Sequence, residues 1–180
     1  MPFDLQPLLQ NELVTLKPLQ ENEFETLYAV AADPLIWEQH PNKDRYKSEV
    51  FENYFDGALK SKGAFLAIDK ATGEAMGSSR YYDLFEEKSS VAIGYTFFAR
   101  KYWGTPVNRL VKTLMLDHAF RFVDEVIFHV GEHNFRSQKA MEKLGAEKID
   151  EIVMAYYGEP DRRNFVYRIG KKEWGNLKMR

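Results

Sequence analysis

The chain has 180 residues, of which 44% are hydrophobic and 29% charged, which suits one globular domain spanning residues 1–180. Its formal net charge of −2 provides no basic surface for nucleic acid or an anionic membrane. Because the chain contains no cysteine, disulfides, thiolate nucleophiles and cysteine-ligated zinc are excluded.

The ends and the hydropathy pattern point to a cytoplasmic protein. The first residues, MPFDLQPLLQ, lack the basic segment and long apolar run of a secretory signal. No run of about 18 apolar residues, the length needed to cross a bilayer, is present. We therefore expect no membrane span.

The first third of the chain predicts a strand and two helices. Residues 12–19 form a strand, and residues 21–33 a helix that Pro34 ends, because a residue before proline avoids the α region. Residues 34–42 form an irregular connection that carries aromatic side chains. Ser48 is expected to cap a second helix that runs to about Lys60.

The pattern then changes to strands. Residues 63–69 and 75–84 predict a hairpin around the turn at 70–74. Residues 90–99 are apolar enough for a central strand. A helix over residues 107–123 follows.

The remaining elements are a strand at 125–131, a helix at 134–145 ended by Gly145, and strands near 149–157 and 164–169. The strand, helix and strand between residues 90 and 130 form a crossover, which predicts a parallel, right-handed pair. The fold class is therefore α/β or α+β, with a mixed sheet flanked by helices.

The stretch RKYWGTPVNRLVK, residues 100–112, places a glycine between a strand and a helix. Helix N-termini present free amides and positive dipole charge, and a glycine lets an anion approach closely. Thr105 is a candidate N-cap and Pro106 a candidate first helical residue, which leaves the amides of Val107 and Asn108 free beside Arg109. The same pattern also occurs in ordinary turns, so an anion cradle and a simple turn both stay open.

Two segments, IGYTFFARKYWGTPVNRLVKTLMLDHAF and VIFHVGEHNFRSQKAMEKLGA, resemble the GNAT superfamily of acetyl-CoA-dependent N-acetyltransferases. In the second segment the spacing of Asn134, Ser137, Lys143, Leu144 and Gly145 is similar to that of the family. The similarity extends over nearly the whole chain and is greatest to the branch with the ribosomal-protein alanine N-acetyltransferases. It implies a sheet with a splayed parallel strand pair.

The resemblance also implies where acetyl-CoA binds. The acyl-CoA motif, usually Gln/Arg-x-x-Gly-x-Gly/Ala, falls on residues 103–108, and Trp103, Pro106 and Asn108 depart from it. The implied pantetheine site is the strand end near Phe97 and Phe98, with Asn134 on the other side of the splay. The full set of cofactor-binding candidates is Phe97, Phe98, Trp103, Gly104, Thr105, Val107, Asn108, Arg109 and Asn134.

The catalytic candidates are His129 and Ser137. A backbone amide near Phe97 or Phe98 is the implied oxyanion donor. Many relatives carry a tyrosine seven residues after the asparagine to protonate the thiolate, and this position is Met141. Ser137, one turn earlier, is the available hydroxyl.

The position at which relatives carry a glutamate base is His129, with its side chain on the face opposite Phe128 and Val130. A histidine pKa near 6.5 suits proton acceptance at neutral pH. A general base and a histidine bonded within the sheet both stay open. The other histidines are assigned to the core (His118) or to solvent-facing loops (His40 and His133).

Trp37, Glu38 and Tyr82 are candidates for the acceptor side, with Glu38 suited to a cationic amine. One of the adjacent Tyr81 and Tyr82 must face the core. The closing stretch GEPDRRN is expected to be a solvated hairpin tip. No set of histidine and carboxylate residues has metal-ligand spacing, so no metal is expected.

The leading function is transfer of acetyl from acetyl-CoA to a primary amine by direct attack. The acceptor could be a small-molecule amine or a protein N-terminus, with polyamines, antibiotics and amino acids all open, and no nucleic-acid or membrane partner is expected. The alternative is a catalytically weak acyl-CoA-binding or interaction module, which Pro106 and Met141 favour. A homodimer is possible.

Overall fold

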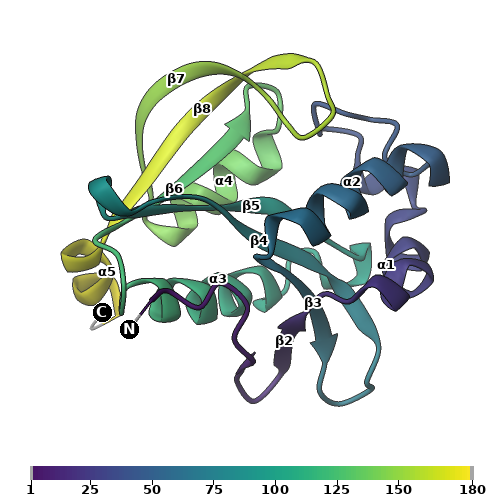
Figure 1. Ribbon diagram of the computed structural model, residues 1–180, viewed down its shortest axis with the longest axis horizontal. Coiled ribbons are helices and arrows are strands. Elements are labelled where there is room, and N and C mark those ends of the chain that lie inside the picture. Colours follow the sequence, from purple (N-terminus) through teal and green to yellow (C-terminus); the bar gives the residue numbers. More distant parts are fainter. Residues whose placement is uncertain (1, 179–180) are drawn as a thin grey trace.

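One mixed sheet carries the described part of the chain, residues 2–178, in a computed structural model (Figure 1). Eight strands follow the spatial order β1-β2-β3-β4-β5-β6-β8-β7. Their bounds are β1 Leu9–Gln10, β2 Val14–Pro18, β3 Ala64–Asp69, β4 Ala75–Phe85, β5 Ser90–Phe98, β6 Glu125–Gly131, β7 Glu147–Ala155 and β8 Asp161–Gly170.

Helices cover both faces of this sheet (Figure 1). The α-helices are α1 Phe24–Ala31, α2 Ser48–Ser61, α3 Val107–Ala119, α4 Phe135–Leu144 and α5 Lys171–Lys178. Helices α1 and α2 cover one face, and α3 lies across the other, with α4 and α5 also packed on that side. The predicted mixed sheet with helices on both faces is confirmed.

The strands β5 and β6 form a parallel pair, as the crossover through α3 predicts, but they pair over a short length. Their register joins only Ser90–Ala92 to Glu125–Ile127. Beyond these residues β5 continues to Phe98 and β6 to Gly131 without pairing to each other. The two strands therefore separate at their carboxyl ends, where unpaired backbone groups become available to a ligand.

A bulge in β5 lies at the start of this separation. The register with β4 shifts between Ser78 and Arg80, and Tyr95 has a φ of 52°. This left-handed conformation is uncommon for a bulky residue and is typical of functional sites. The bulge turns the Tyr95 ring toward the face of the sheet that α2 covers.

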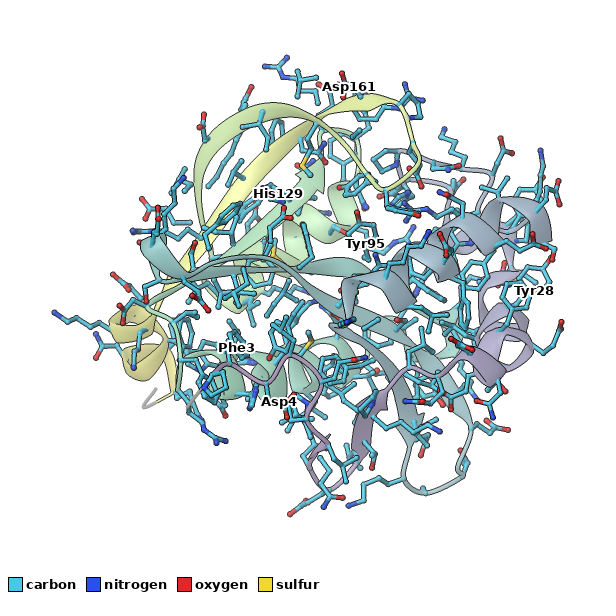
Figure 2. The ribbon with its side chains drawn as sticks, in the orientation of Figure 1. Phe3, Asp4, Tyr28, Tyr95, His129 and Asp161 are labelled. Carbon is cyan, nitrogen blue, oxygen red and sulfur yellow. The ribbon has the colours of Figure 1, made fainter. Side chains whose placement is uncertain are left out.

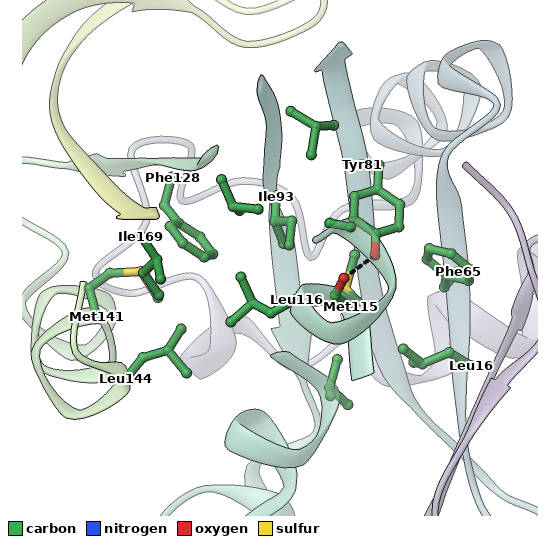
Figure 3. Close-up of a cluster of buried hydrophobic side chains, with 14 of the residues drawn as sticks. Leu16, Phe65, Tyr81, Ile93, Met115, Leu116, Phe128, Met141, Leu144 and Ile169 are labelled. Carbon is green, nitrogen blue, oxygen red and sulfur yellow. Dashed lines mark hydrogen bonds between the residues drawn. The ribbon is translucent and has the colours of Figure 1, made fainter. Parts of the chain in front are cut away.

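The core has a cluster on each face of the sheet. On the α3 face, Met115 and Leu116 of α3 are fully buried against β4, β5 and β6 (Figure 3). The Tyr81 hydroxyl donates a hydrogen bond to the Met115 carbonyl at 2.5 Å. On the other face, Trp37 and Phe97 pack beneath α1 and α2.

The structure corrects several predicted boundaries. The helix predicted to reach residue 123 ends at Ala119, because residues 120–123 form tighter turns while Phe120 and Val123 continue to fill the core. Ser48 is the first residue of α2 rather than its cap, since Lys47 holds the extended capping conformation. The strand predicted at 149–157 spans Glu147–Ala155.

Two elements were not predicted. The strand β1 has two residues, too few to show any periodicity. Helix α5 is mostly polar and buries only Trp174, whose indole N–H donates to Asp117 Oδ1 of α3 at 2.8 Å. Tertiary contacts rather than an apolar stripe hold both elements.

Candidate active site

The loop before α3 has the open geometry that an anion cradle needs. Gly104 has a φ of 73°, a left-handed conformation that favours glycine, and a Cβ built there meets no atom within 4 Å. The backbone conformation thus favours glycine, and the space in front of it is free. Arg109 is exposed at the start of the following helix.

Helix α3 begins at Val107, as the predicted range 107–123 has it, but its capping differs from the prediction. Pro106 is the N-cap and Thr105 precedes it. The Thr105 hydroxyl donates to the Tyr102 carbonyl at 2.6 Å and accepts a weak hydrogen bond of 3.4 Å from the Val107 amide. The Leu110 amide is the first to bond back into the helix, so the amides of Asn108 and Arg109 have no helical partner.

Trp103 closes the other side of the cradle. Its indole N–H donates to the Phe98 carbonyl at 3.1 Å, which fixes the loop to the end of β5. The Arg136 guanidinium of α4 lies 3.6 Å from the centre of the Trp103 ring. Burial lowers the pKa of Arg136, and the exposed Glu38 opposes that shift. Glu38 thus lies close enough to Arg136 for its charge to act on that guanidinium.

These features fit a CoA thioester. The unpaired edge of β5 can pair with an amide-containing arm, and the cradle offers free amides, Arg109 and Arg136 to phosphate. Phe97 and Phe98 point to opposite faces, because their side chains belong to the two separate core clusters. Their backbone, not their side chains, would face a ligand.

Where β5 and β6 separate, a tyrosine and a histidine form a pair. The Tyr82 hydroxyl of β4 lies 2.8 Å from His129 Nδ1 of β6, and Figure 2 shows His129 and Tyr95 on the same face of the sheet. Burial lowers the pKa of His129, with Asp83 opposing, and burial raises the pKa of Tyr82 well above its usual value. Both groups are therefore uncharged at neutral pH, and we assign the phenol as donor to Nδ1.

A glycine makes this pair possible. The Tyr82 ring crosses β5 directly over Gly94, where a Cβ would lie 2.9 Å from Tyr82 Cε1. Tyr81, the preceding residue, points into the core, as the alternation along a strand predicts. Tyr82 is thus the member of the pair that faces the site.

Helix α4 borders the same opening. Asn134 Oδ1 accepts a hydrogen bond of 3.2 Å from the Ser137 amide and so caps the helix. Ser137 is half-buried. Met141 is 5% exposed and packs in the core beside Leu144, Phe128 and Ile169 (Figure 3). It occupies a core position one turn beyond Ser137.

Between the sheet and α2 lies a cluster of aromatic rings around Arg45. The guanidinium carbon lies 5.2–5.9 Å from the ring centres of Trp37, Tyr54, Tyr95 and Tyr156. Its Nη2 and Nε donate to Glu159 Oε1 at 2.5 and 2.8 Å. Trp37 is 2% exposed, and its indole donates to the Ala31 carbonyl.

Most of GEPDRRN is exposed, as predicted for a solvated hairpin tip, but Asn164 is buried in β8, and the exception at the tip itself is Glu159. Its side chain is only 7% exposed, because the turn between β7 and β8 folds over α2 and pairs with Arg45. His40 is also not a solvent-facing residue: it is half-buried with Nε2 3.1 Å from Arg45 Nη1, and burial lowers its pKa well below the usual value. His133 is exposed, and His118 is buried with Nε2 donating to the Asp4 carbonyl, as predicted.

The structure thus brings Tyr82 and His129 together above Gly94 of β5. Glu38 lies on the side of Trp103 and Arg136, where its charge acts on the Arg136 guanidinium. Sequence reasoning missed several buried or stacked residues near the site, namely Arg45, Arg80, Tyr95, Arg136, Tyr156 and Glu159. An arginine within a predicted strand, as Arg80 is within β4, was the one available signal. The others depend on long-range contacts.

Within residues 2–178 no group of three or more histidine, aspartate or glutamate side chains is placed to hold a metal ion. No helix in that range combines the length and apolar character needed to cross a bilayer.

Comparison with known structures supports the fold. A GCN5-related N-acetyltransferase from Brucella melitensis superposes with a TM-score of 0.84 at 19% identity, over 99% of this chain and 85% of that one. Spermidine N-acetyltransferase from Vibrio cholerae, solved with CoA and spermine, gives 0.69 at 14%, over 92% and 100%. A Vibrio cholerae protein provisionally described as a ribosomal-protein-serine acetyltransferase gives 0.71 at 14%, over 94% and 99%.

No match was found among curated proteins. The sequence profile of the Acetyltransferase (GNAT) domain matches residues 14–147, which include the cradle, the splayed strands and helix α4. That range is well over half of the chain, so the chain belongs to the GNAT acetyltransferase domain family.

Proposed function

We propose that the protein transfers the acetyl group of acetyl-CoA to a primary amine by direct attack. The observation that carries the proposal is the Tyr82–His129 pair at the point where β5 and β6 separate. GNAT acetyltransferases use acetyl-CoA, and the cradle before α3 leads to this same opening.

In this proposal the amine nitrogen attacks the thioester carbon, a C–N bond forms, and the C–S bond breaks as the thiolate leaves. The proton of the attacking nitrogen passes to the Tyr82 oxygen while Tyr82 passes its own proton to His129 Nδ1. A neutral imidazole is required for this role, and burial supplies it by lowering the pKa of His129. A backbone amide near Phe97 or Phe98 stabilises the oxyanion, and Ser137 and Asn134 lie on the sulfur side.

The cofactor-binding and acceptor-side roles that the sequence predicts are also part of this proposal. The cofactor-side residues are Trp103, Gly104, Thr105, Val107, Asn108 and Arg109, with Arg136 added by its stacking on Trp103. Trp37 supports the acceptor side from the core. Membership of the ribosomal-protein branch, a cytoplasmic location and a homodimer stay predictions.

A second candidate, an acyl-CoA-binding module without turnover, is favoured by Met141. A methionine side chain has no proton to donate to the departing thiolate, and this one is buried in the core. Thiol release from acetyl-CoA with a panel of amines separates the two functions, with the acetylated product identified by mass spectrometry. We expect amine-dependent thiol release; CoA binding without any product would favour the binding module.

A further inference from the structure

Two guanidinium groups are buried against the same aromatic rings between the sheet and α2. Arg45 is 1% exposed and Arg80 is 2% exposed. Both lie against the same rings: their guanidinium carbons are 5.2 and 5.1 Å from the Tyr54 centre, and 5.9 and 3.9 Å from the Tyr95 centre. Burial lowers the pKa of Arg80, and repulsion by the Arg45 charge lowers it further by a smaller amount.

Only one of these two charges has a counter-ion. Arg45 pairs with Glu159, as described above. Among residues 2–178, no carboxylate forms an ion pair with Arg80, whose Nη2 donates to the Tyr54 carbonyl at 3.1 Å and whose Nε has no partner. The buried Arg80 charge therefore lacks a counter-ion, and its Nε–H lacks a hydrogen-bond acceptor.

The surrounding titratable groups do not supply the missing negative charge. Burial raises the pKa of Tyr95 and of Tyr82, so both phenols keep their protons at neutral pH. Burial lowers the pKa of His40 and of His129, so both rings are neutral. The buried charges are those of Arg45, Arg80 and Glu159, which sum to +1, while Asp83, whose charge acts on Tyr82 and His129, is exposed. An unpaired buried charge is costly unless an anion joins it.

Arg80 lies next to the proposed proton-transfer pair. Arg80 and Tyr82 are two residues apart on β4 and face the same side of the sheet, roughly 7 Å apart along the strand. The Tyr95 ring bridges them, with its centre 3.9 Å from the Arg80 guanidinium and 5.2 Å from the Tyr82 ring. A small molecule bound to Arg80 by one end would place its other end near Tyr82.

We infer that the acceptor is a small amine that carries a carboxylate, such as an amino acid, and that Arg80 binds this carboxylate. The inference rests on the proposed N-acetyltransferase activity. A carboxylate has the single negative charge that the cluster lacks, and its two oxygens match the guanidinium fork. A polyamine would instead add positive charge to the cluster.

The test compares matched amines with and without the carboxylate. Phenylalanine is paired with phenethylamine and lysine with cadaverine, spermidine is added, and kcat/KM is expressed per free amine. We expect the parent to prefer the carboxylate-bearing member at least tenfold. The preference should collapse in Arg80→Met, persist in part in Arg80→Lys, and be unchanged in Arg162→Met, which removes an exposed arginine.

Other outcomes would overturn the inference. Three results would contradict a carboxylate site at Arg80 while still establishing N-acetyltransferase activity. They are equal rates within each pair in the parent, a preference for spermidine, and a preference that survives Arg80→Met. If no amine is acetylated, the proposed function fails, and carboxylate binding is then decided by thermal shift with phenylacetate in the presence of CoA. Stabilisation of the parent but not of Arg80→Met would support the site, and no stabilisation of the parent would exclude it.

Discussion

At the scale of single residues, the proposed mechanism depends most on the Tyr82–His129 pair. The uncharged state of both groups follows from burial, which acts in opposite directions on the pKa of a phenol and of an imidazole. A neutral imidazole bonded to a protonated phenol is ready to accept a proton through it. A histidine bonded only for structural reasons would show the same distance, so kinetics must separate the two interpretations.

Replacing His129 with alanine should lower kcat/KM by at least about 100-fold, the lower end of the range for a general base. Tyr82→Phe should give a loss of similar size, because it breaks the proton path at 2.8 Å. Steady-state kinetics from about pH 6 to pH 9 measures both effects, with CoA affinity determined separately. His133→Ala, at an exposed histidine, is the matched control. A His129→Ala enzyme with parental turnover would assign the ring a structural role.

Lys112 is a second residue whose state is set by burial. Its Nζ donates to Thr96 Oγ1 at 2.5 Å and Ser79 Oγ at 3.1 Å, beneath the β5 bulge. Burial lowers its pKa to about 7. The unfolded chain therefore binds one more proton than the folded chain between about pH 7 and pH 10.4, and stability rises with pH in that window.

Lys112→Met should remove this pH dependence. The free energy of unfolding of the parent, relative to the variant, should rise by about 2 kcal/mol from pH 7 to pH 9. Urea denaturation at the two pH values measures the difference, and Lys143→Met, at an exposed lysine, should show none. A difference that stays constant with pH would mean that Lys112 keeps its charge in the folded state.

At the scale of elements, the loop that joins β5 to α3 combines a required backbone conformation with open space. Gly104→Asn should be accommodated, because asparagine tolerates the left-handed region, whereas Gly104→Val is strained at a φ of 73°. Calorimetric titration with CoA should show weaker binding for valine than for asparagine, with both proteins folded. If Gly104→Val binds CoA as tightly as the parent, the loop is only a turn.

The turn between β7 and β8 is held by a buried ion pair to Arg45, which precedes α2, and by an exposed network to α2 itself. Tyr157 bonds Asp56 and Lys60 of α2 through its hydroxyl at 2.6 and 2.9 Å. The Asn53 amide donates to the Tyr157 carbonyl at 2.8 Å. The exposed bonds contribute little each, so the buried Arg45–Glu159 pair should decide whether the turn stays in place.

Arg45→Met should release this turn, because it leaves the Glu159 carboxylate buried without its partner, a cost of about 3–5 kcal/mol. We expect the amides of residues 157–159 to exchange hydrogen faster while those of β6 keep parental protection. Hydrogen exchange read by mass spectrometry measures both regions. Lys60→Met, which removes an exposed contact with the same turn, should change little, and unchanged exchange in Arg45→Met would contradict the role of the pair.

Elements with a strong period could be predicted from sequence, and the rest depended on contacts between distant residues. The strand at 125–131 was predicted with the bounds that the structure has, because β-branched and aromatic residues fill most of it. The two-residue β1 and the polar α5 have no such pattern. The position of His129 could be predicted by resemblance. Its contact with Tyr82, 47 residues away, could not, because it depends on the order of the strands and on the space above Gly94.

At the scale of the whole molecule, the sheet divides at the splay, yet the core does not. Strands β1–β5 and β6–β8 share only the short parallel pairing at Ser90–Ala92. The core on the α3 face nevertheless runs from Val14 of β2 to Trp174 of α5. Helix α3 lies across both parts, which predicts that they unfold together (Figure 1).

Leu116→Ala should therefore destabilise the whole chain rather than one part of it. Leu116 is fully buried in this shared core, and truncation of a buried leucine costs about 2–5 kcal/mol. Urea unfolding followed by tryptophan fluorescence and by far-ultraviolet circular dichroism should give coincident curves, both shifted to lower urea. Leu35→Ala, at a leucine 46% exposed, should shift them by less than about 0.5 kcal/mol. If the two probes separate in Leu116→Ala, strands β1–β5 and strands β6–β8 unfold as two units. Helix α3 would then stabilise only the unit that unfolds at the higher urea concentration.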